Sequence, residues 1–522
     1  NTASGIVSTI SGGEENTASG RASIVGGGYY NVASGRNSTI GGGYSNQASG
    51  DYSTVSGGGK DGYPNIASGE SSTVGGGYYN VASGSNSTIG GGRYNASSGD
   101  DSTIGGGQDN TASVNRSTIG GGYSNTASSY YATVGGGRYN ASSGDDSTTS
   151  GGYNNTARGN GSFIGGGSEN QASNQYATVG GGYQNIASGG YAVIGGGTYN
   201  IASGNLYATV SGGYRSTIGS GLSNTASGDY STVSGGQQHI ASGNTSTISG
   251  GFTNTASGVS STVGGGTTNI ASGNKSTISG GGKNTTSGYY STIGGGLSNI
   301  SGYASYGYST VSGGRGNIIS GDYATIGGGS GNNVTAQYWG TVSGGDTNTA
   351  SGDNSTVGGG TTNIASGTSS TVSGGQQHIA SGNESTIGGG NYNQASGFKS
   401  TIGGGNSNIA NQLRATVGGG EQNSASGYDA STVSGGLSNT ASGTESTVGG
   451  GASNQATGSN SIVGGGTGNI ASANFSSVLG GQSNTTSTFV NSHIVGSNIT
   501  SDRDDCTFVE NLSIKSIPTS AV

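Results

Sequence analysis

Methionine is absent from this 522-residue chain, which contains one cysteine (Cys506), two prolines and one tryptophan. A single cysteine excludes a disulfide framework and a Cys-x-x-Cys metal site. Two prolines exclude a collagen-like triple helix, which also needs glycine at every third residue. No run of about 18 apolar residues occurs, so we expect no membrane span.

Charged residues are also scarce, at 7% of the chain with a net charge of −8 and no basic block. We therefore expect no nucleic-acid partner. Apolar residues make up only 28% of the chain, and 119 residues are glycine. This composition alone is typical of disordered chains. A strict repeat overrides that interpretation, because a fixed period indicates a repeat architecture.

The repeat is a 15-residue phrase, N-x-A-S-G-x-x-S-T-V/I-x-G-G-x-x, whose positions we number 1 to 15 from the asparagine. About 32 copies lie between Asn1 and Asn484. Histidine replaces the asparagine twice, at His239 and His378. Extra residues interrupt the period at few places: about four near Lys60–Pro64, about three near Tyr303–Tyr306, and single ones near Asn333 and Tyr428.

Each half of the repeat contains one short alternating stretch, which predicts a β-strand with side chains on opposite faces. Each stretch ends in glycine, which can take the positive φ of a tight corner without steric cost. Two strands and two corners in every repeat predict an all-β fold, a parallel β-solenoid without helices. About 32 coils, each about 4.8 Å high, would form a rod roughly 150 Å long.

Alternation also predicts which side chains fill the interior, namely positions 1, 3, 8 and 10, whereas positions 2, 4 and 9 face outward. The predicted core residues are Ala33, Ile40, Ala48, Val55, Val74, Ala82 and Ile89, and the predicted corner and ladder residues are Asn31, Asn46, Asn80, Gly35 and Gly50. One alanine and one valine or isoleucine per coil bury too little surface to offset the ordering of a whole repeat. We therefore expect backbone ladders and stacked asparagines to hold the coils together.

These patterns predict a continuous solenoid over residues 1–488, with irregular coils near 58–64, 205–223 and 300–309. Within 205–223, Val210 and Ile218 are eight residues apart, which predicts either a half-turn phase slip or a looped-out excursion. Residues 489–522 leave the repeat, and we expect them to cap the open strand edges of the solenoid. Because the chain starts in mid-phrase, we expect it to be part of a longer protein.

No constellation of residues indicates catalysis, a cofactor or a metal ion, so we expect a protein that is not an enzyme. His239 and His378 are far apart in the chain and cannot meet within one stack of coils. Asp502, Asp504 and Asp505 are interrupted by Arg503 and match no calcium loop. The glycine triplets lack the lysine of a phosphate-binding loop, and the serines have no partnered base.

Two outward columns are candidate contact surfaces. The first is threonine at position 9: Thr39, Thr54, Thr73, Thr88 and Thr103. A regular threonine rank is the pattern of ice-binding solenoids, but β-propensity alone also favours threonine there. The second is tyrosine at positions 14 and 15: Tyr29, Tyr44 and Tyr79. These rings could stack on sugars or neighbouring fibres, or only shield the corner backbone.

Asn37, Asn86 and Asn354 each head an Asn-Ser-Thr sequon at position 7. If the host glycosylates secreted chains, these three asparagines are candidate glycosylation sites. The alternative is that sequons arise by chance in a chain so rich in asparagine, serine and threonine.

The phrases NVASGRNSTIGGG and NTASGDYSTVSGG resemble the head repeats of trimeric autotransporter adhesins, which also occur in tail-fibre-like proteins of phages and large viruses. The resemblance covers residues 1 to about 490. It implies a left-handed β-roll and a homotrimer on a cell or virion surface, although the alanine of the phrase replaces a larger aliphatic residue of many adhesin repeats. The last segment resembles the junction to a trimerising or self-cleaving domain, which implies a missing domain beyond it.

On this resemblance the function would be that of a structural, extracellular or virion-borne fibre that attaches to surface glycans or a receptor. Two alternatives remain open at this stage. One is a self-assembling surface filament built from copies of the chain. The other is an ice-binding solenoid that uses the threonine column.

Overall fold

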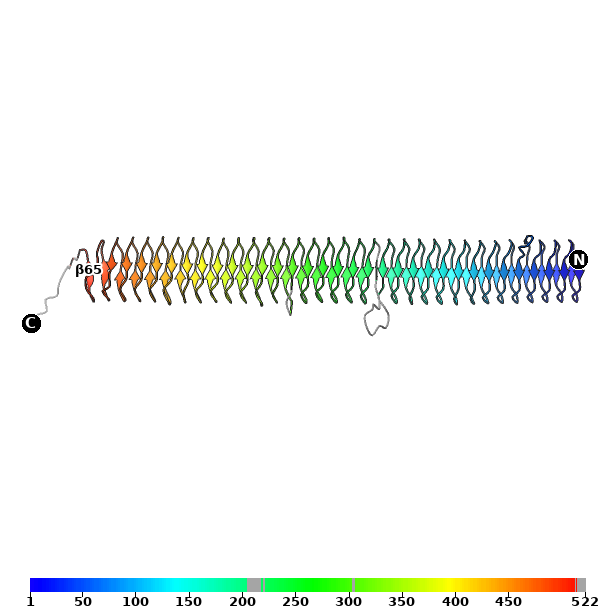
Figure 1. The fold of residues 1–522 in the computed structure, drawn as a ribbon, viewed down its shortest axis with the longest axis horizontal. Coiled ribbons are helices and arrows are strands. Elements are labelled where there is room, and N and C mark those ends of the chain that lie inside the picture. Colours follow the sequence, from blue (N-terminus) through cyan, green and yellow to red (C-terminus); the bar gives the residue numbers. More distant parts are fainter. Residues whose placement is uncertain (204–216, 219–220, 303–305, 512, 514–522) are drawn as a thin grey trace, which may run out of the picture. The chain divides into compact units, whose positions relative to one another are not determined.

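The computed structural model describes residues 1–203, 217–218, 221–302, 306–511 and 513. The chain divides into two units, Asn1–Thr268 and Asn269–Val522. Each unit, taken by itself, is a parallel β-solenoid with one sequence repeat per turn, and the described residues contain no helix (Figure 1). The predicted fold class is confirmed.

The strands are short and fall at fixed positions of the repeat. Odd-numbered strands up to β63 (Thr485–Thr486) occupy positions 2 and 3, and even-numbered strands up to β62 (Ser477–Val478) occupy positions 9 and 10. The first unit holds β1–β34 and the second β35–β65. Within a unit each strand up to β62 pairs in parallel with the strand two further along, so that β6 (Thr39–Ile40) places Ile40 opposite Val55 of β8 (Thr54–Val55). Residues one repeat apart therefore lie over one another.

Extra residues leave the register of the strands unchanged. Gln47 pairs with Ile66, although an uninterrupted period would place Gly62 opposite it. The additional residues lie around an antiparallel bridge between Lys60 and Tyr63. Thr292 likewise pairs with Thr310, although Gly307 is one period away. The first pairing confirms the predicted insertion near Lys60–Pro64. The second shows three residues beyond one period, and residues 303–305 of the insertion predicted near Tyr303–Tyr306 lie outside the described residues.

The predicted irregular segment 205–223 falls mostly on residues 204–216 and 219–220, which lie outside the described residues. The strands that flank it pair with each other directly, Val193 with Thr217 and Ile201 with Thr225. Position 9 therefore still faces position 9, and position 2 still faces position 2. The half-turn phase slip, one of the two alternatives that the sequence predicts, is wrong for the strands that flank the segment.

The interior is filled by buried apolar and polar side chains, as alternation predicts. All the predicted core residues, Ala33, Ile40, Ala48, Val55, Val74, Ala82 and Ile89, have 0% exposure. Asn31 and Ser38 are also fully buried, whereas Ser34 is exposed and Val32 and Thr39 are half-buried at the surface. The predicted facing of each strand is confirmed.

The positive φ that the sequence predicts for Gly35 and Gly50 is wrong. Neither has the positive φ expected of it, because the left-handed residues nearby are Asn37 (φ 52°) and Tyr52 (φ 60°). An added Cβ at Gly35 would lie 2.0 Å from the carbonyl oxygen of Gly50 in the next coil. These glycines are required by close coil stacking, whereas the third glycine of a triplet, such as Gly28 (φ 88°), supplies a left-handed conformation.

After the last repeat the even ladder continues through two three-residue strands, β64 (His493–Val495) and β65 (Thr507–Val509). Strand β64 pairs with β62 and then with β65. Cys506, which precedes β65, is a free and half-buried thiol. Among the described residues no helix is long and apolar enough to cross a membrane.

Candidate functional site: the outward faces and edges of the coils

Asparagine at position 1 joins three successive coils from inside the solenoid. The Nδ2 of Asn46 donates to the carbonyl oxygens of Gly42 and Gly58, each at 2.9 Å. Its backbone N–H donates to Oδ1 of Asn31 at 3.0 Å, and its own Oδ1 accepts the N–H of Asn65 at 3.2 Å. Every polar group of the buried carboxamide is therefore used for structure.

The two histidines at position 1 reproduce part of this pattern. Nδ1 of His378 accepts the backbone N–H of Asn393 at 3.1 Å, as an asparagine Oδ1 would. Nε2 is buried without a well-formed hydrogen bond, and burial is the main effect that lowers the pKa of His378. His239 has the equivalent contact and the same direction of pKa shift. Both are structural substitutes for asparagine, as the sequence predicts.

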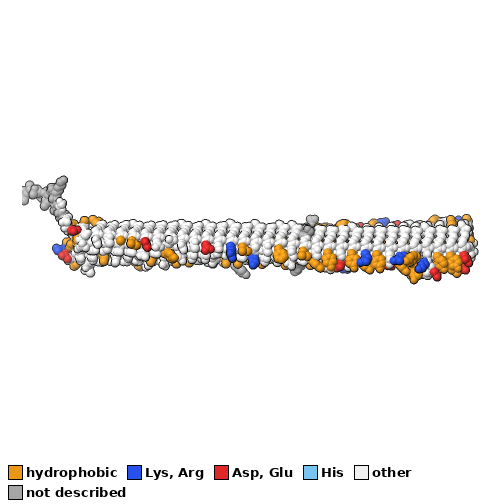
Figure 2. Space-filling model, turned by 90° about the horizontal axis from the view of Figure 1, so that it is seen from above, with side chains coloured by type: hydrophobic (Ala, Val, Ile, Leu, Met, Phe, Trp, Pro, Cys, Tyr) orange, Lys and Arg blue, Asp and Glu red, His pale blue; other side chains and the backbone are white. Residues whose placement is uncertain are grey.

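Charge is confined to the edges of the coils. In the described repeats, charged residues occupy positions 6, 7, 14 and 15 or the 58–64 insertion, and the outward strand positions 2, 4, 9 and 11 carry a single charged residue, Arg158. Figure 2 shows one face that is almost entirely white, with apolar and charged side chains gathered along its border. The flat faces are therefore surfaces of neutral side chains, and charge-based recognition is limited to the edges and to Arg158.

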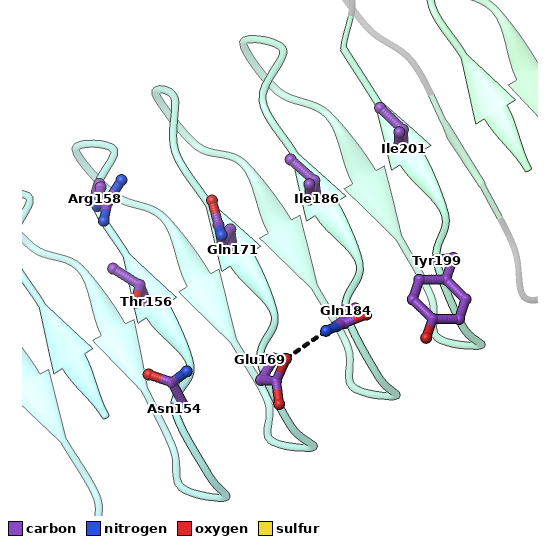
Figure 3. A pocket seen from close by; sticks show the side chains of 9 residues that line it. All are labelled: Asn154, Thr156, Arg158, Glu169, Gln171, Gln184, Ile186, Tyr199 and Ile201. Carbon is purple, nitrogen blue, oxygen red and sulfur yellow. Dashed lines mark hydrogen bonds between the residues drawn. The ribbon is translucent and has the colours of Figure 1, made fainter. Parts of the chain in front are cut away.

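A hollow of about 530 Å³ lies on the face of the odd-numbered strands in the first unit (Figure 3). Its floor consists of position-2 residues of four successive coils, on β21 (Thr156–Ala157), β23 (Gln171–Ala172), β25 (Ile186–Ala187) and β27 (Ile201–Ala202). One border is formed by position-15 residues of the preceding corners: Asn154, Glu169, Gln184 and Tyr199. Its volume falls within the range of small-ligand sites. No feature of the repeat pattern predicts this hollow.

Arg158 lies at one end of this hollow, at position 4 where the other described repeats carry serine or another small or neutral residue. Its side chain is exposed, and no ion pair or side-chain hydrogen bond of its guanidinium is found in the part of the chain that the structure describes. Figure 3 shows Arg158 and Tyr199 at opposite ends of the residues that line the hollow. Glu169 lies on the border opposite Arg158. The Nε2 of Gln184 donates a hydrogen bond to Oε2 of Glu169.

The threonine column lies on the face of the even-numbered strands, and in the first unit Ile24, Phe163 and Val193 interrupt it. Thr39 pairs with Thr54, Thr54 with Thr73, Thr73 with Thr88, and Thr88 with Thr103. In the second unit every even strand from β36 (Thr277–Ile278) to β58 (Thr447–Val448) begins with threonine. Glycine or serine occupies position 11 beside this rank, so the face is flat and neutral.

The tyrosine column forms contacts between coils. The rings of Tyr29 and Tyr44 lie 5.3 Å apart, and those of Tyr79 and Tyr94 lie 5.3 Å apart. Several other pairs in this column meet edge to face. These contacts indicate that the rings cover one another at the corners, so their faces are only partly available to a sugar.

A second aromatic column, which sequence analysis missed, occupies position 7 in the second unit. Tyr290, Tyr308, Tyr323 and Trp339 stack with centroid distances of 4.8, 5.2 and 5.7 Å. Nζ of Lys275 lies 4.6 Å from the ring centroid of Tyr290 and covers that end of the stack. The recurrence of aromatic residues at position 7 was the signal that could have identified it.

The three sequon asparagines lie at left-handed corners. Asn37 has φ 52°, and Asn86 and Asn354 each have φ 57°. Asn37 is half-buried, whereas Asn86 and Asn354 are exposed. The side chain of Asn86 donates to Oδ1 of Asp101 at 3.1 Å. Exposed amide groups at Asn86 and Asn354 are compatible with modification.

Two aspartates of the acidic run near the C-terminus have partners within the chain. Arg503 donates to both carboxylate oxygens of Asp502, at 2.8 and 3.2 Å, and this contact lowers the pKa of Asp502. Asp505 accepts a hydrogen bond from Asn491. Among the described residues no three His, Cys, Asp or Glu side chains are grouped so that they could hold a metal ion.

The chain matches no protein-family model, and a search of curated proteins finds no related sequence.

Proposed function

We propose that the chain is a structural, non-catalytic fibre segment that presents attachment surfaces outside a cell or on a virion. The observation that carries this proposal is the repetition of one bonding pattern from coil to coil within each unit. The asparagine at position 1 and the parallel strand pairs bind every coil to its neighbours. A stack built this way gains stability with length, because each coil is stabilised only by the coils next to it.

Two further observations support a mechanical role with surface attachment. The buried asparagine at position 1 is used for hydrogen bonds between coils, as in Asn46. The side chains that vary between coils lie outward, on the faces and at the edges. We further propose that copies of the chain associate, as a homotrimer or as an open filament, because long uncharged faces favour lateral contact.

Negative-stain electron microscopy of the purified protein tests the proposal, together with SDS gels of unheated samples and a binding assay on cell surfaces. Thin rods, an SDS-resistant oligomer and binding to surfaces are expected. Compact particles would contradict the fibre proposal. Open-ended fibres much longer than one chain would favour the self-assembling filament.

Ice binding is the second candidate, and the unbroken threonine rank from Thr277 to Thr447 is the observation that favours it. The flat, neutral face beside this rank is suited to ordered water. Thermal hysteresis and faceted ice crystals in the presence of the protein would support this function. Ordinary freezing behaviour at high protein concentration would exclude it.

A further inference from the structure

We propose that the hollow over β21, β23, β25 and β27 binds an acidic oligosaccharide, with Arg158 receiving a carboxylate of the sugar chain. This inference names a ligand class for the attachment surface and rests on the proposed function. Arg158 is the one charged residue on the otherwise neutral faces of the described coils, and it lines this hollow.

An arginine at this place is suited to a ligand. Its guanidinium is always charged and presents a planar fork of donors that matches a carboxylate with two parallel hydrogen bonds. Two other surface arginines of the first unit have partners: Arg36 donates to the hydroxyl of Tyr52, and Arg93 donates to Gln108. Among the described residues Arg21, like Arg158, has no side-chain partner, but it lies at an edge position and does not line the hollow. In the described residues the guanidinium of Arg158 is left for an external anion.

The rest of the hollow supplies contacts for a hydroxyl-rich chain. Gln171 on the floor and Asn154 on the border each carry a carboxamide, which both donates and accepts and so suits sugar hydroxyls. Ile186, Ile201 and Tyr199 form an apolar end that can pack against the C–H face of a sugar ring. Figure 3 shows these side chains following one another from coil to coil.

The same residues argue against other anions. A polyanion such as nucleic acid needs several cations along its path, whereas this hollow has one arginine and also carries Glu169 on its border. Glu169 is bonded to Gln184 and lies across the hollow from Arg158. A carboxylate is therefore attracted at the Arg158 end, and the uncharged part of the sugar chain extends toward Tyr199.

Calorimetric titration with tri-galacturonic acid and with the neutral galactose trisaccharide tests the inference on the full chain. Binding of the acidic probe is expected to be about tenfold tighter than that of the neutral one, and Arg158→Ala should remove this difference. Arg158→Lys should keep only part of it, because lysine lacks the planar fork. Gln171→Ala should weaken the binding of both trisaccharides. Arg21→Ala, at an exposed edge position, is the matched control and should bind as the unmodified chain does.

Because Arg158 points outward, its variants should keep the unmodified melting temperature, which circular dichroism checks. Equal binding of the two trisaccharides, no binding of either, or full binding by Arg158→Ala would overturn the inference. Tighter binding of an acidic hexapeptide than of the sugar would also overturn it. If Arg158→Ala still forms rods and attaches to surfaces, this inference fails while the proposed function stands; absence of rods in the unmodified protein is a failure of the proposed function.

Discussion

The backbone N–H of Asn46 donates to Oδ1 of Asn31, 3.0 Å away and one repeat earlier in the chain. The same relationship joins Asn31 to Asn16 and Asn65 to Asn46. The buried carboxamide thus joins each of these coils to the next through a side-chain hydrogen bond. This explains how a chain with 119 glycines holds a single register.

Asn46→Ala is expected to destabilise the coils around residue 46 by about 1–3 kcal/mol, because it leaves the buried N–H of Asn65 without a partner and removes the side-chain donor of the Gly42 and Gly58 carbonyls. Gln47→Ala, at the adjacent exposed position, should change stability by about 0.5 kcal/mol or less. Chemical denaturation measures both, and hydrogen exchange should place the lost protection in the neighbouring coils. Equal effects of the two substitutions would contradict the structural role of the ladder.

Ile40→Asp is expected to cost several kcal/mol, about 3 or more, because an unpaired charge would replace a side chain that is fully buried. Thr39→Asp, one residue away and at the surface, should cost about 1 kcal/mol or less in an isolated chain. Thermal melts of both variants test the facing of the strand. A large loss for Thr39→Asp as well would show that this face packs against another chain.

The register and facing of the strands could be predicted because they depend on two simple features. The fixed period determines which residues are neighbours, as for Ile40 and Val55, and alternation determines which side of a strand is buried. Corner geometry was predicted less well. A glycine in sequence does not reveal whether it is needed for a close approach alone, as Gly35 is, or also for a left-handed φ, as Gly28 is.

The candidate site could not be predicted, because it depends on exceptions to the repeat and not on the repeat itself. Arg158 is one substitution among hundreds of positions, and its importance appears only when the four coils that line the hollow are seen together. The aromatic stack of Tyr308 and Tyr323 was missed for a related reason. Their recurrence at position 7 was visible in the sequence, but the tyrosines at positions 14 and 15 form a more conspicuous column.

Gly35→Ala is expected to be poorly tolerated, because the added Cβ would lie 2.0 Å from the carbonyl oxygen of Gly50. Gly42→Ala is the matched control, since the nearest atom to its added Cβ is 3.9 Å away. We expect a loss of about 2 kcal/mol or more for the first substitution and about 1 kcal/mol or less for the second. Denaturant unfolding of the two variants checks this, and similar midpoints would contradict the steric role of Gly35.

The two buried histidines are expected to make stability depend on pH. Burial lowers the pKa of His239 and of His378 below the ordinary value of 6.5, so the unfolded chain binds protons more readily than the folded chain. Stability is therefore complete above about pH 6.5 and falls as the pH drops below it, by up to about 1.4 kcal/mol per pH unit for each histidine. The fall ends once the folded histidines are themselves protonated.

Replacing both histidines in the variant His239→Asn/His378→Asn should remove the part of this dependence that sets in below about pH 6.5. It should also raise stability at neutral pH, because an asparagine at 378 can donate to the two neighbouring glycine carbonyls as Asn393 does at 2.9 Å. Melting temperatures from about pH 5 to 8 test both effects, and His493→Asn, in the segment after the repeats, is the control. An unchanged pH profile in the double variant would show that carboxylates, and not the histidines at position 1, control acid stability.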